Sequence, residues 1–184
     1  MRADFKVVLD ACVLANYAVA NLLLALAEKP RLYLPVWSEE ILSETRRTQV
    51  GKLKWNLEIA DSFQAALRHA FPEAMTCGFD HHIHECANEA KDRHVLACAI
   101  QSKAEVILTF NLKDFPKETL SPWGVTVEHP QDYLTMLFRL EPLQVMRHLG
   151  GIASKRGCTL EDHLIDLGRF LPAFSAKVLE ELEA

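Results

Sequence analysis

Two kinds of apolar pattern alternate along this chain. Four short runs rich in apolar and β-branched residues predict buried strands, at residues 5–10, 31–36, 104–110 and 124–130. Apolar residues that recur every three or four positions predict helices, at residues 14–28, after a capping Ser38, and at 53–70, 92–102 and 130–140. Strands that alternate with helices indicate an α/β sandwich around a mostly parallel sheet. In such sheets ligands bind at the carboxyl ends of the strands.

The character of the chain changes after about residue 140. Three further helices are predicted, at residues 143–155, 159–170 and 173–183. We therefore expect one α/β domain over residues 1–140 and a helical extension over residues 141–184. Residues 75–90 show no clear period, and we interpret them as a loop with a short strand or turn.

Composition narrows the class of protein. With 184 residues, 49% of them hydrophobic, the chain can bury a substantial core. No apolar run approaches the roughly 18 residues that span a bilayer, and the start MRADFKVVLD lacks the layout of a signal peptide. The five cysteines are odd in number and scattered, which favours reduced thiols over a disulfide framework. We therefore expect a cytoplasmic protein without membrane association.

The net charge of −5 and the pI of about 5.9 argue against a protein that coats nucleic acid through bulk positive charge. They do not exclude a nuclease, because catalytic acids would contribute to the negative balance. Basic residues also stand near the candidate acids in the sequence, namely Arg46, Arg47, Lys52, Lys54, Lys91, Arg93, Lys113 and Lys117. These side chains are either solvated surface or contacts for a phosphate backbone.

Four carboxylates stand beside apolar segments that would hold them in place: Asp10, Glu44, Asp92 and Asp114. Asp10 ends one predicted strand and Asp114 follows another, whereas Asp92 begins a predicted helix. Buried acids that gather at one place cannot all stay ionised without a cation, and the natural cation is a hard divalent metal. Each acid also has a simpler interpretation. Asp10 and Asp92 could be helix caps, and Asp114 a turn residue. Glu44 could be a solvated surface acid, with Glu40 one helical turn away as the alternative.

Other chemistries fit the sequence less well. One cluster of histidines and cysteines could suggest a zinc site, but its spacing matches no standard zinc pattern. The cluster consists of Cys77, His81, His82, His84, Cys86 and His94. We interpret this cluster as a polar loop beside a catalytic groove. An aspartyl-phosphate phosphatase needs a second acid two residues after Asp10, where this chain has Cys12. No glycine-rich phosphate-binding loop occurs either.

Five stretches together resemble PIN-domain ribonucleases, and specifically the VapC-type toxins of prokaryotic toxin–antitoxin pairs. The stretches are VVLDACVL, WSEEILSE, KDRHVLACAI, VILTFNLKDFP and GVTVEHPQDYL, and they extend over about residues 5–138. The resemblance is specific because the motifs occur in the order and spacing of the family. It implies a PIN-like three-layer sandwich.

By motif, the resemblance implies a site of four catalytic acids, Asp10, Glu44, Asp92 and Asp114. Asp10, Asp92 and Asp114 would bind Mg²⁺ or Mn²⁺, which prefer oxygen ligands. Glu44 would bind the metal or orient a water molecule, and Thr109 and Asn111 would support the site. Many relatives have Asp where this chain has Asn111. Whether Asn111 or Asp114 lies nearer the metal is therefore left open, as is the number of metal ions.

The resemblance further implies a metal-dependent hydrolysis of RNA that leaves 5′-phosphate and 3′-hydroxyl ends. The resemblance also implies that the protein binds a small antitoxin, a segment of which fills the groove. Whether the protein forms a homodimer is left open. Two other interpretations stay open as well. One is a housekeeping RNA-processing nuclease, and the other is a catalytically inert PIN-fold binding module, which predicts no metal-dependent activity.

Overall fold

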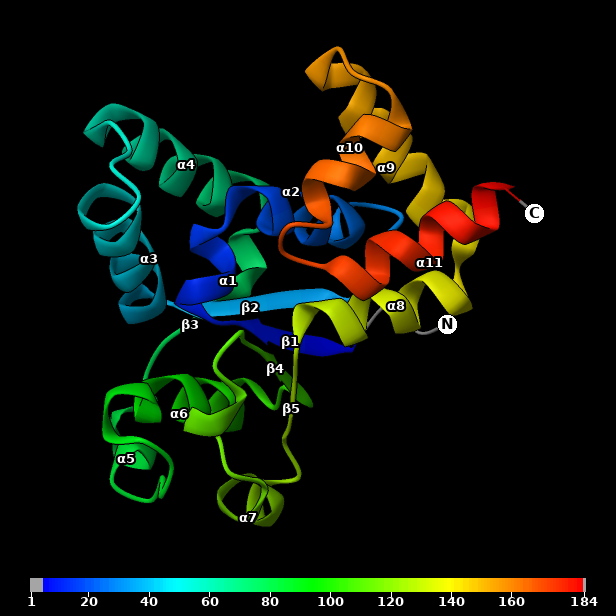
Figure 1. Cartoon of the computed structure of the whole chain (residues 1–184). Coiled ribbons are helices and arrows are strands. Elements are labelled where there is room, and N and C mark those ends of the chain that lie inside the picture. Colours follow the sequence, from blue (N-terminus) through cyan, green and yellow to red (C-terminus); the bar gives the residue numbers. More distant parts are fainter. Residues whose placement is uncertain (1–4, 184) are drawn as a thin grey trace.

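The computed structural model describes residues 5–183, and its centre is a sheet of five parallel strands (Figure 1). The strands are β1 (Lys6–Leu9), β2 (Leu34–Ser38), β3 (Met75–Thr76), β4 (Val106–Leu108) and β5 (Thr126–Glu128). Their order across the sheet is β3-β2-β1-β4-β5. The predicted α/β class is confirmed, and the strands of this sheet are all parallel.

The register of the sheet determines which residues leave it together. Val8 of β1 pairs with Val36 of β2 and with Ile107 of β4. One position further along, Leu9 pairs with Leu108. Because β1 and β4 run in the same direction, the residues that follow them emerge side by side at the carboxyl edge of the sheet.

Helices cover both faces of the sheet. They are α1 (Ala11–Ala15), α2 (Tyr17–Ala27), α3 (Glu39–Gly51), α4 (Leu57–Ala70), α5 (Asp80–Ile83), α6 (Arg93–Ser102), α7 (Lys117–Leu120), α8 (Pro130–Leu140), α9 (Pro142–Arg156), α10 (Leu160–Leu167) and α11 (Pro172–Glu183). Figure 1 shows α1 and α2 on one face of the sheet, and α5, α6 and α7 on the other. Single 3-10 turns complete the chain: η1 (Pro72–Ala74), η2 (Ala90–Asp92), η3 (Leu112–Asp114) and η4 (Ser121–Trp123). The predicted three-layer sandwich with a helical extension is confirmed.

Side-chain caps explain where several helices begin. Ser38 Oγ accepts a hydrogen bond from the Ile41 amide at 3.2 Å, so α3 begins as predicted. The prediction of one helix over residues 14–28 is wrong, because the chain breaks at Asn16. The Asn16 side chain accepts from the Val19 amide at 3.3 Å and thereby starts α2 as a separate helix.

Two other segments differ from the prediction. The helix expected from residue 53 begins at Leu57, because the Asn56 side chain caps it by accepting from the Glu58 amide at 2.8 Å. Residues 75–90 contain the short strand β3, as expected, and also helix α5, which the sequence did not predict. A helix of four residues is too short to display a helical period.

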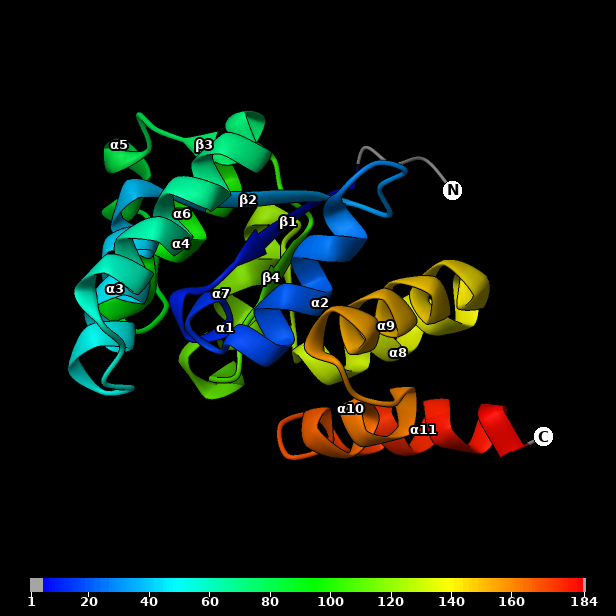
Figure 2. The same ribbon diagram turned by 90° about the horizontal axis from the view of Figure 1, so that it is seen from above.

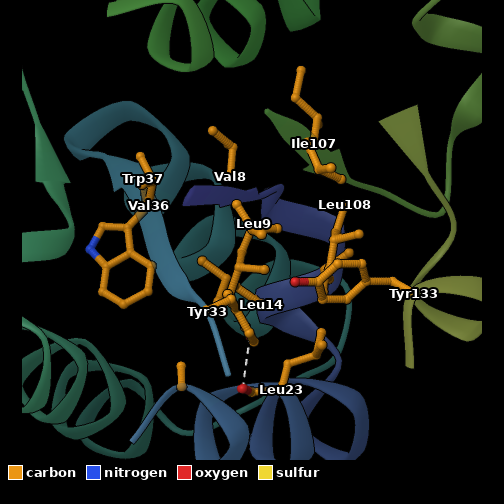
Figure 3. Packing of buried hydrophobic residues seen from close by; sticks show 14 of the residues in the cluster. Val8, Leu9, Leu14, Leu23, Tyr33, Val36, Trp37, Ile107, Leu108 and Tyr133 are labelled. Carbon is orange, nitrogen blue, oxygen red and sulfur yellow. Dashed lines mark hydrogen bonds between the residues drawn. The ribbon is translucent and has the colours of Figure 1, made fainter. Parts of the chain in front are cut away.

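The core extends over both faces of the sheet, and Figure 3 shows the part of it around Tyr33 and Leu23 of α2. Tyr33 and Tyr133 are almost fully buried there, and their rings meet edge to face with centroids 5.6 Å apart. The Tyr33 hydroxyl donates a 2.8 Å hydrogen bond to the Leu23 carbonyl, drawn as a dashed line in Figure 3. A buried hydroxyl without a partner would be costly, so this bond fixes α2 to the chain that enters β2.

The extension packs on the helical layer. Helix α9 contacts α2, α8 and α10, and Figure 2 shows α10 and α11 on the outside, beyond α8 and α9. Val145, Leu149 and Ile152 of α9 belong to the same buried cluster as the core of the sheet. The division into residues 1–140 and 141–184 stays a prediction. Within residues 5–183, no helix has the length and apolar character needed to cross a membrane.

Helix α9 offers a matched pair of leucines to test this packing. Leu149 is 0% exposed, whereas Leu143 on the same helix is 86% exposed. We expect Leu149→Ala to lower the free energy of unfolding by about 2–4 kcal/mol because it leaves a cavity. Leu143→Ala should change it by less than about 0.5 kcal/mol. Urea denaturation followed by circular dichroism measures both values, and equally small losses would show that α9 does not share the core.

Candidate metal-binding and catalytic site

Hydrogen bonds hold Asp10 at the carboxyl edge of the sheet. It follows Leu9 of β1, and Thr109 follows Leu108 of β4, so the two side chains emerge together. Thr109 Oγ1 donates to Asp10 Oδ2 at 2.7 Å, and the Ala11 amide donates to Asp10 Oδ1 at 2.6 Å. Both Asp10 and Thr109 are buried. The carboxylate therefore has a fixed orientation, and it caps α1 as well as facing Thr109.

Two more contacts extend this arrangement. The Cys12 thiol donates to Asp10 Oδ2 at 3.0 Å. Burial, and then the charge of Asp10, raise the pKa of the Cys12 thiol, which keeps its proton available for this bond. The Asn111 amide donates to Thr109 Oγ1 at 3.0 Å, while the Asn111 side chain is exposed. Asn111 thus joins η3 to the Thr109 hydroxyl through its backbone.

Asp92 is a buried acid with a strongly raised pKa. It is 8% exposed, and its Oδ2 atom has no hydrogen-bond partner. Asp92 precedes α6 but makes no capping bond, so a helix cap does not explain it. Burial is the largest cause that raises the pKa of Asp92 to about 6, and the charges of Asp10, Asp114 and Glu44 add to it, whereas Lys91 opposes the shift. The structure therefore brings the other three predicted acids within electrostatic reach of Asp92.

Lys91 supplies positive charge to this group of acids. Its Nζ atom donates to Asp114 Oδ2 at 2.9 Å and lies 3.6 Å from Asp92 Oδ2. The two oxygen atoms are therefore at most 6.5 Å apart, the sum of these distances. The hydrogen bond from Lys91 lowers the pKa of Asp114. The Glu89 amide donates to the Asp114 carbonyl at 3.2 Å, which connects η3 to the segment that carries Asp92.

Glu44 contacts a buried histidine, His94, that lies close to Asp92 in the chain. Its Oε2 atom lies 3.4 Å from His94 Nε2, and Glu40 Oε2 lies 3.9 Å from Nδ1 on the other side of the same ring. His94 is 6% exposed and belongs to α6, two residues after Asp92. Of the two glutamates, Glu44 is the one whose charge raises the pKa of Asp92. Glu44 therefore has the closer electrostatic link to the other acids.

The donor atoms of this group suit a hard divalent cation. Carboxylate oxygens are the ligands that Mg²⁺ and Mn²⁺ prefer, and Asp92 Oδ2 is a buried acceptor that a cation would satisfy. In residues 5–183, however, no three His, Cys, Asp or Glu side chains are arranged to hold a metal ion. Lys91 instead lies beside two of the acids. The chemistry fits, but binding requires Lys91 to move away and the carboxylates to approach one another.

Sequence reasoning missed two functional candidates next to Asp92. The sequence pattern indicates a surface residue or phosphate contact at Lys91 and a polar loop residue at His94. Both stand in the segment KDRH, one residue before and two residues after the acid. A cation directly beside a buried acid at a helix start is a signal that could have identified Lys91.

Comparison with models of protein families assigns the chain to a family. The sequence model of the PIN domain family matches residues 6–113. The chain therefore belongs to the PIN domain family. The matched segment includes Asp10, Glu44 and Asp92, and it ends one residue before Asp114.

A relative is known from Mycobacterium tuberculosis, a protein named "Putative ribonuclease VapC50". The two sequences are 38% identical over 107 residues, which are 56% of this chain. The match spans 63% of the length of the relative. No solved structure matches the chain.

The raised pKa of Asp92 predicts a pH dependence of stability in the metal-free protein. The unfolded carboxyl group releases its proton near pH 3.8, but the folded one near pH 6. The folded state thus binds this proton more tightly, and the contribution of Asp92 to wild-type stability falls as the pH rises through this window. We expect Asp92→Asn to be more stable than the wild type by about 2–3 kcal/mol above pH 7, and about equal to it below pH 4.

Urea denaturation at several pH values measures this difference. Asp80→Asn is the control, because Asp80 is an exposed aspartate on α5. The control should show no such gain. A stability difference between Asp92→Asn and the wild type that does not change with pH would contradict the assigned crowding of charge.

Proposed function

We propose that this protein is a metal-dependent endoribonuclease and the toxin of a toxin–antitoxin pair, acting in the cytoplasm. Membership of the PIN domain family and the similarity to a protein named as a ribonuclease support this activity. The observation that carries the proposal is the state of Asp92. A buried carboxylate with an oxygen that lacks a hydrogen-bond partner, within electrostatic reach of three other acids, is typical of a site that works with a cation.

In this proposal Asp10, Asp92 and Asp114 hold Mg²⁺ or Mn²⁺ through their carboxylate oxygens. Such an ion lowers the pKa of a bound water molecule and neutralises charge that develops on the phosphate. Thr109 and the Ala11 amide keep the Asp10 carboxylate in one orientation. That rigidity matters because a ligand that must be ordered at each turnover binds less well.

Glu44 has a different role from the other acids in this proposal. Its side chain is 39% exposed, whereas those of Asp92 and Asp114 are each 11% exposed. A half-exposed carboxylate can accept a hydrogen bond from a solvent molecule while His94 holds its other side. Glu44 therefore orients the attacking water, and the products are a 5′-phosphate and a 3′-hydroxyl.

The proposed partner is a small antitoxin protein. A cluster of acids that must be neutralised in the absence of metal is a good receptor for a basic side chain from such a partner. An inserted arginine or lysine would supply the same countercharge that Lys91 supplies within the chain. The antitoxin would thereby stabilise the metal-free state and exclude RNA.

Asp10→Asn tests the proposed activity. Asparagine can still accept the hydrogen bond from the Ala11 amide, so the cap of α1 is retained while one ligand charge is lost. We expect the purified variant to cleave RNA in Mg²⁺ at least about a hundredfold more slowly than the wild type, with an unchanged circular dichroism spectrum. Chelation by EDTA should abolish wild-type cleavage, and added Mn²⁺ should restore it. Asp80→Asn, at an exposed position, should cleave normally.

One observation favours the alternative of an inert PIN-fold binding module. Lys91 already pairs with Asp114 and partly neutralises Asp92, as a permanent internal ion pair would. The inert module predicts no cleavage by the wild type and no binding of Mn²⁺. Two results would instead overturn the assigned site. One is cleavage by the wild type that persists in EDTA, and the other is cleavage by Asp10→Asn at the wild-type rate.

A further inference from the structure

Lys91 occupies a special position among the lysines near the acids. Its ammonium group lies 2.9 Å from Asp114 Oδ2 and 3.6 Å from Asp92 Oδ2, and both acids belong to the proposed metal ligands. These two carboxylates come from different turns, η2 and η3, so one ammonium group bridges two segments of the chain. A cation that bridges these two Oδ2 atoms would occupy the same space as the ammonium group.

We propose that Lys91 is an internal counter-ion that competes with the divalent metal for Asp92 and Asp114. The inference rests on the proposed function, since it concerns the metal site of that nuclease. In the metal-free protein Lys91 offsets the repulsion between the acids. When the metal binds, the ammonium group leaves the carboxylates, so the measured metal affinity includes the cost of breaking this ion pair.

The burial pattern allows this exchange. The Lys91 side chain is 64% exposed, whereas those of Asp92 and Asp114 are each 11% exposed. The ammonium group can therefore move into water on its flexible stem without unfolding anything. The carboxylates belong to the site in both states, and Lys91 belongs to it only in the metal-free state.

The displaced lysine does not move far from the site. Lys91 is bonded directly to Asp92 in the chain, and both lie in η2. After exchange its charge remains beside the metal, where the phosphate of an RNA substrate would lie. The same residue thus stabilises the site without metal and attracts the substrate once metal has bound.

A matched control exists at Lys113. It stands directly before Asp114 in η3, as Lys91 stands before Asp92 in η2. Its charge also lowers the pKa of Asp114, yet it forms no ion pair with an acid within the described part of the chain. Lys113 therefore has the general electrostatic effect of a nearby lysine without the direct contact.

The test is calorimetric titration of the metal-free protein with Mn²⁺. We expect Lys91→Met to bind Mn²⁺ at least about fivefold more tightly than the wild type, because the competing ion pair is gone. Lys113→Met should gain less than about twofold, since its charge is solvated and screened. Lys91→Met should also be less stable to urea than the wild type without metal, and this difference should vanish in saturating Mn²⁺.

Each outcome decides between the possibilities. Wild-type binding together with equal or weaker binding by Lys91→Met overturns the competition and leaves the proposed nuclease intact. Equal gains in both lysine variants reduce the effect to general electrostatics and also overturn it. If Lys91→Met binds Mn²⁺ and neither the wild type nor Lys113→Met does, the result supports a competition so strong that Lys91 prevents metal binding. No binding by any of the three proteins overturns the proposed metal-dependent function, and the competition with it. If Lys91→Met does not fold, Lys91→Gln replaces it with the same expectations.

Discussion

Electrostatic repulsion among acids at the carboxyl edge of a parallel sheet is the constraint on which the rest of this site depends. Different contacts offset this repulsion at the three aspartates. Asp10 receives hydrogen bonds from a hydroxyl, a thiol and an amide, and Asp114 receives an ammonium group. Asp92 Oδ2 has no hydrogen-bond partner, and burial, followed by the charges of the other acids, raises the pKa of Asp92 to about 6. The positive charge of Lys91 therefore does not balance all of the acids, and a further cation would do so. This imbalance is the physical basis of the proposed metal dependence.

The sheet makes this crowding possible by removing the freedom of the acids to separate. Pairing of Leu9 with Leu108 in the buried core sets Asp10 beside Thr109. A chain of contacts then runs from Thr109 to the Asn111 amide, through η3 to Asp114, and from the Asp114 carbonyl to Glu89 before η2. The hydrophobic core thus holds like charges together that would separate in a flexible loop.

The architecture could be predicted from the sequence because it rests on local pattern, whereas the assignment of the four acids to one site rests on the resemblance to PIN-domain ribonucleases and stays a prediction. β-branched runs identified β1 and β4, and Pro130 began α8 as expected. The break at Asn16 was missed because the apolar period continues through it, and α5 because four residues carry no period. The roles of Lys91 and His94 depend on which segments meet in space. Pairing across 23 residues, as between Lys91 and Asp114, is not visible in a local window.

The most direct test of the central claim is a crystal structure of the protein with Mn²⁺, using the anomalous signal of manganese to locate the ion. The account predicts an anomalous peak coordinated by oxygen atoms of Asp10, Asp92 and Asp114, with the ammonium group of Lys91 displaced from both carboxylates. A manganese ion bound elsewhere, with the Lys91 ion pair intact and these acids unliganded at a concentration that supports RNA cleavage, would contradict it.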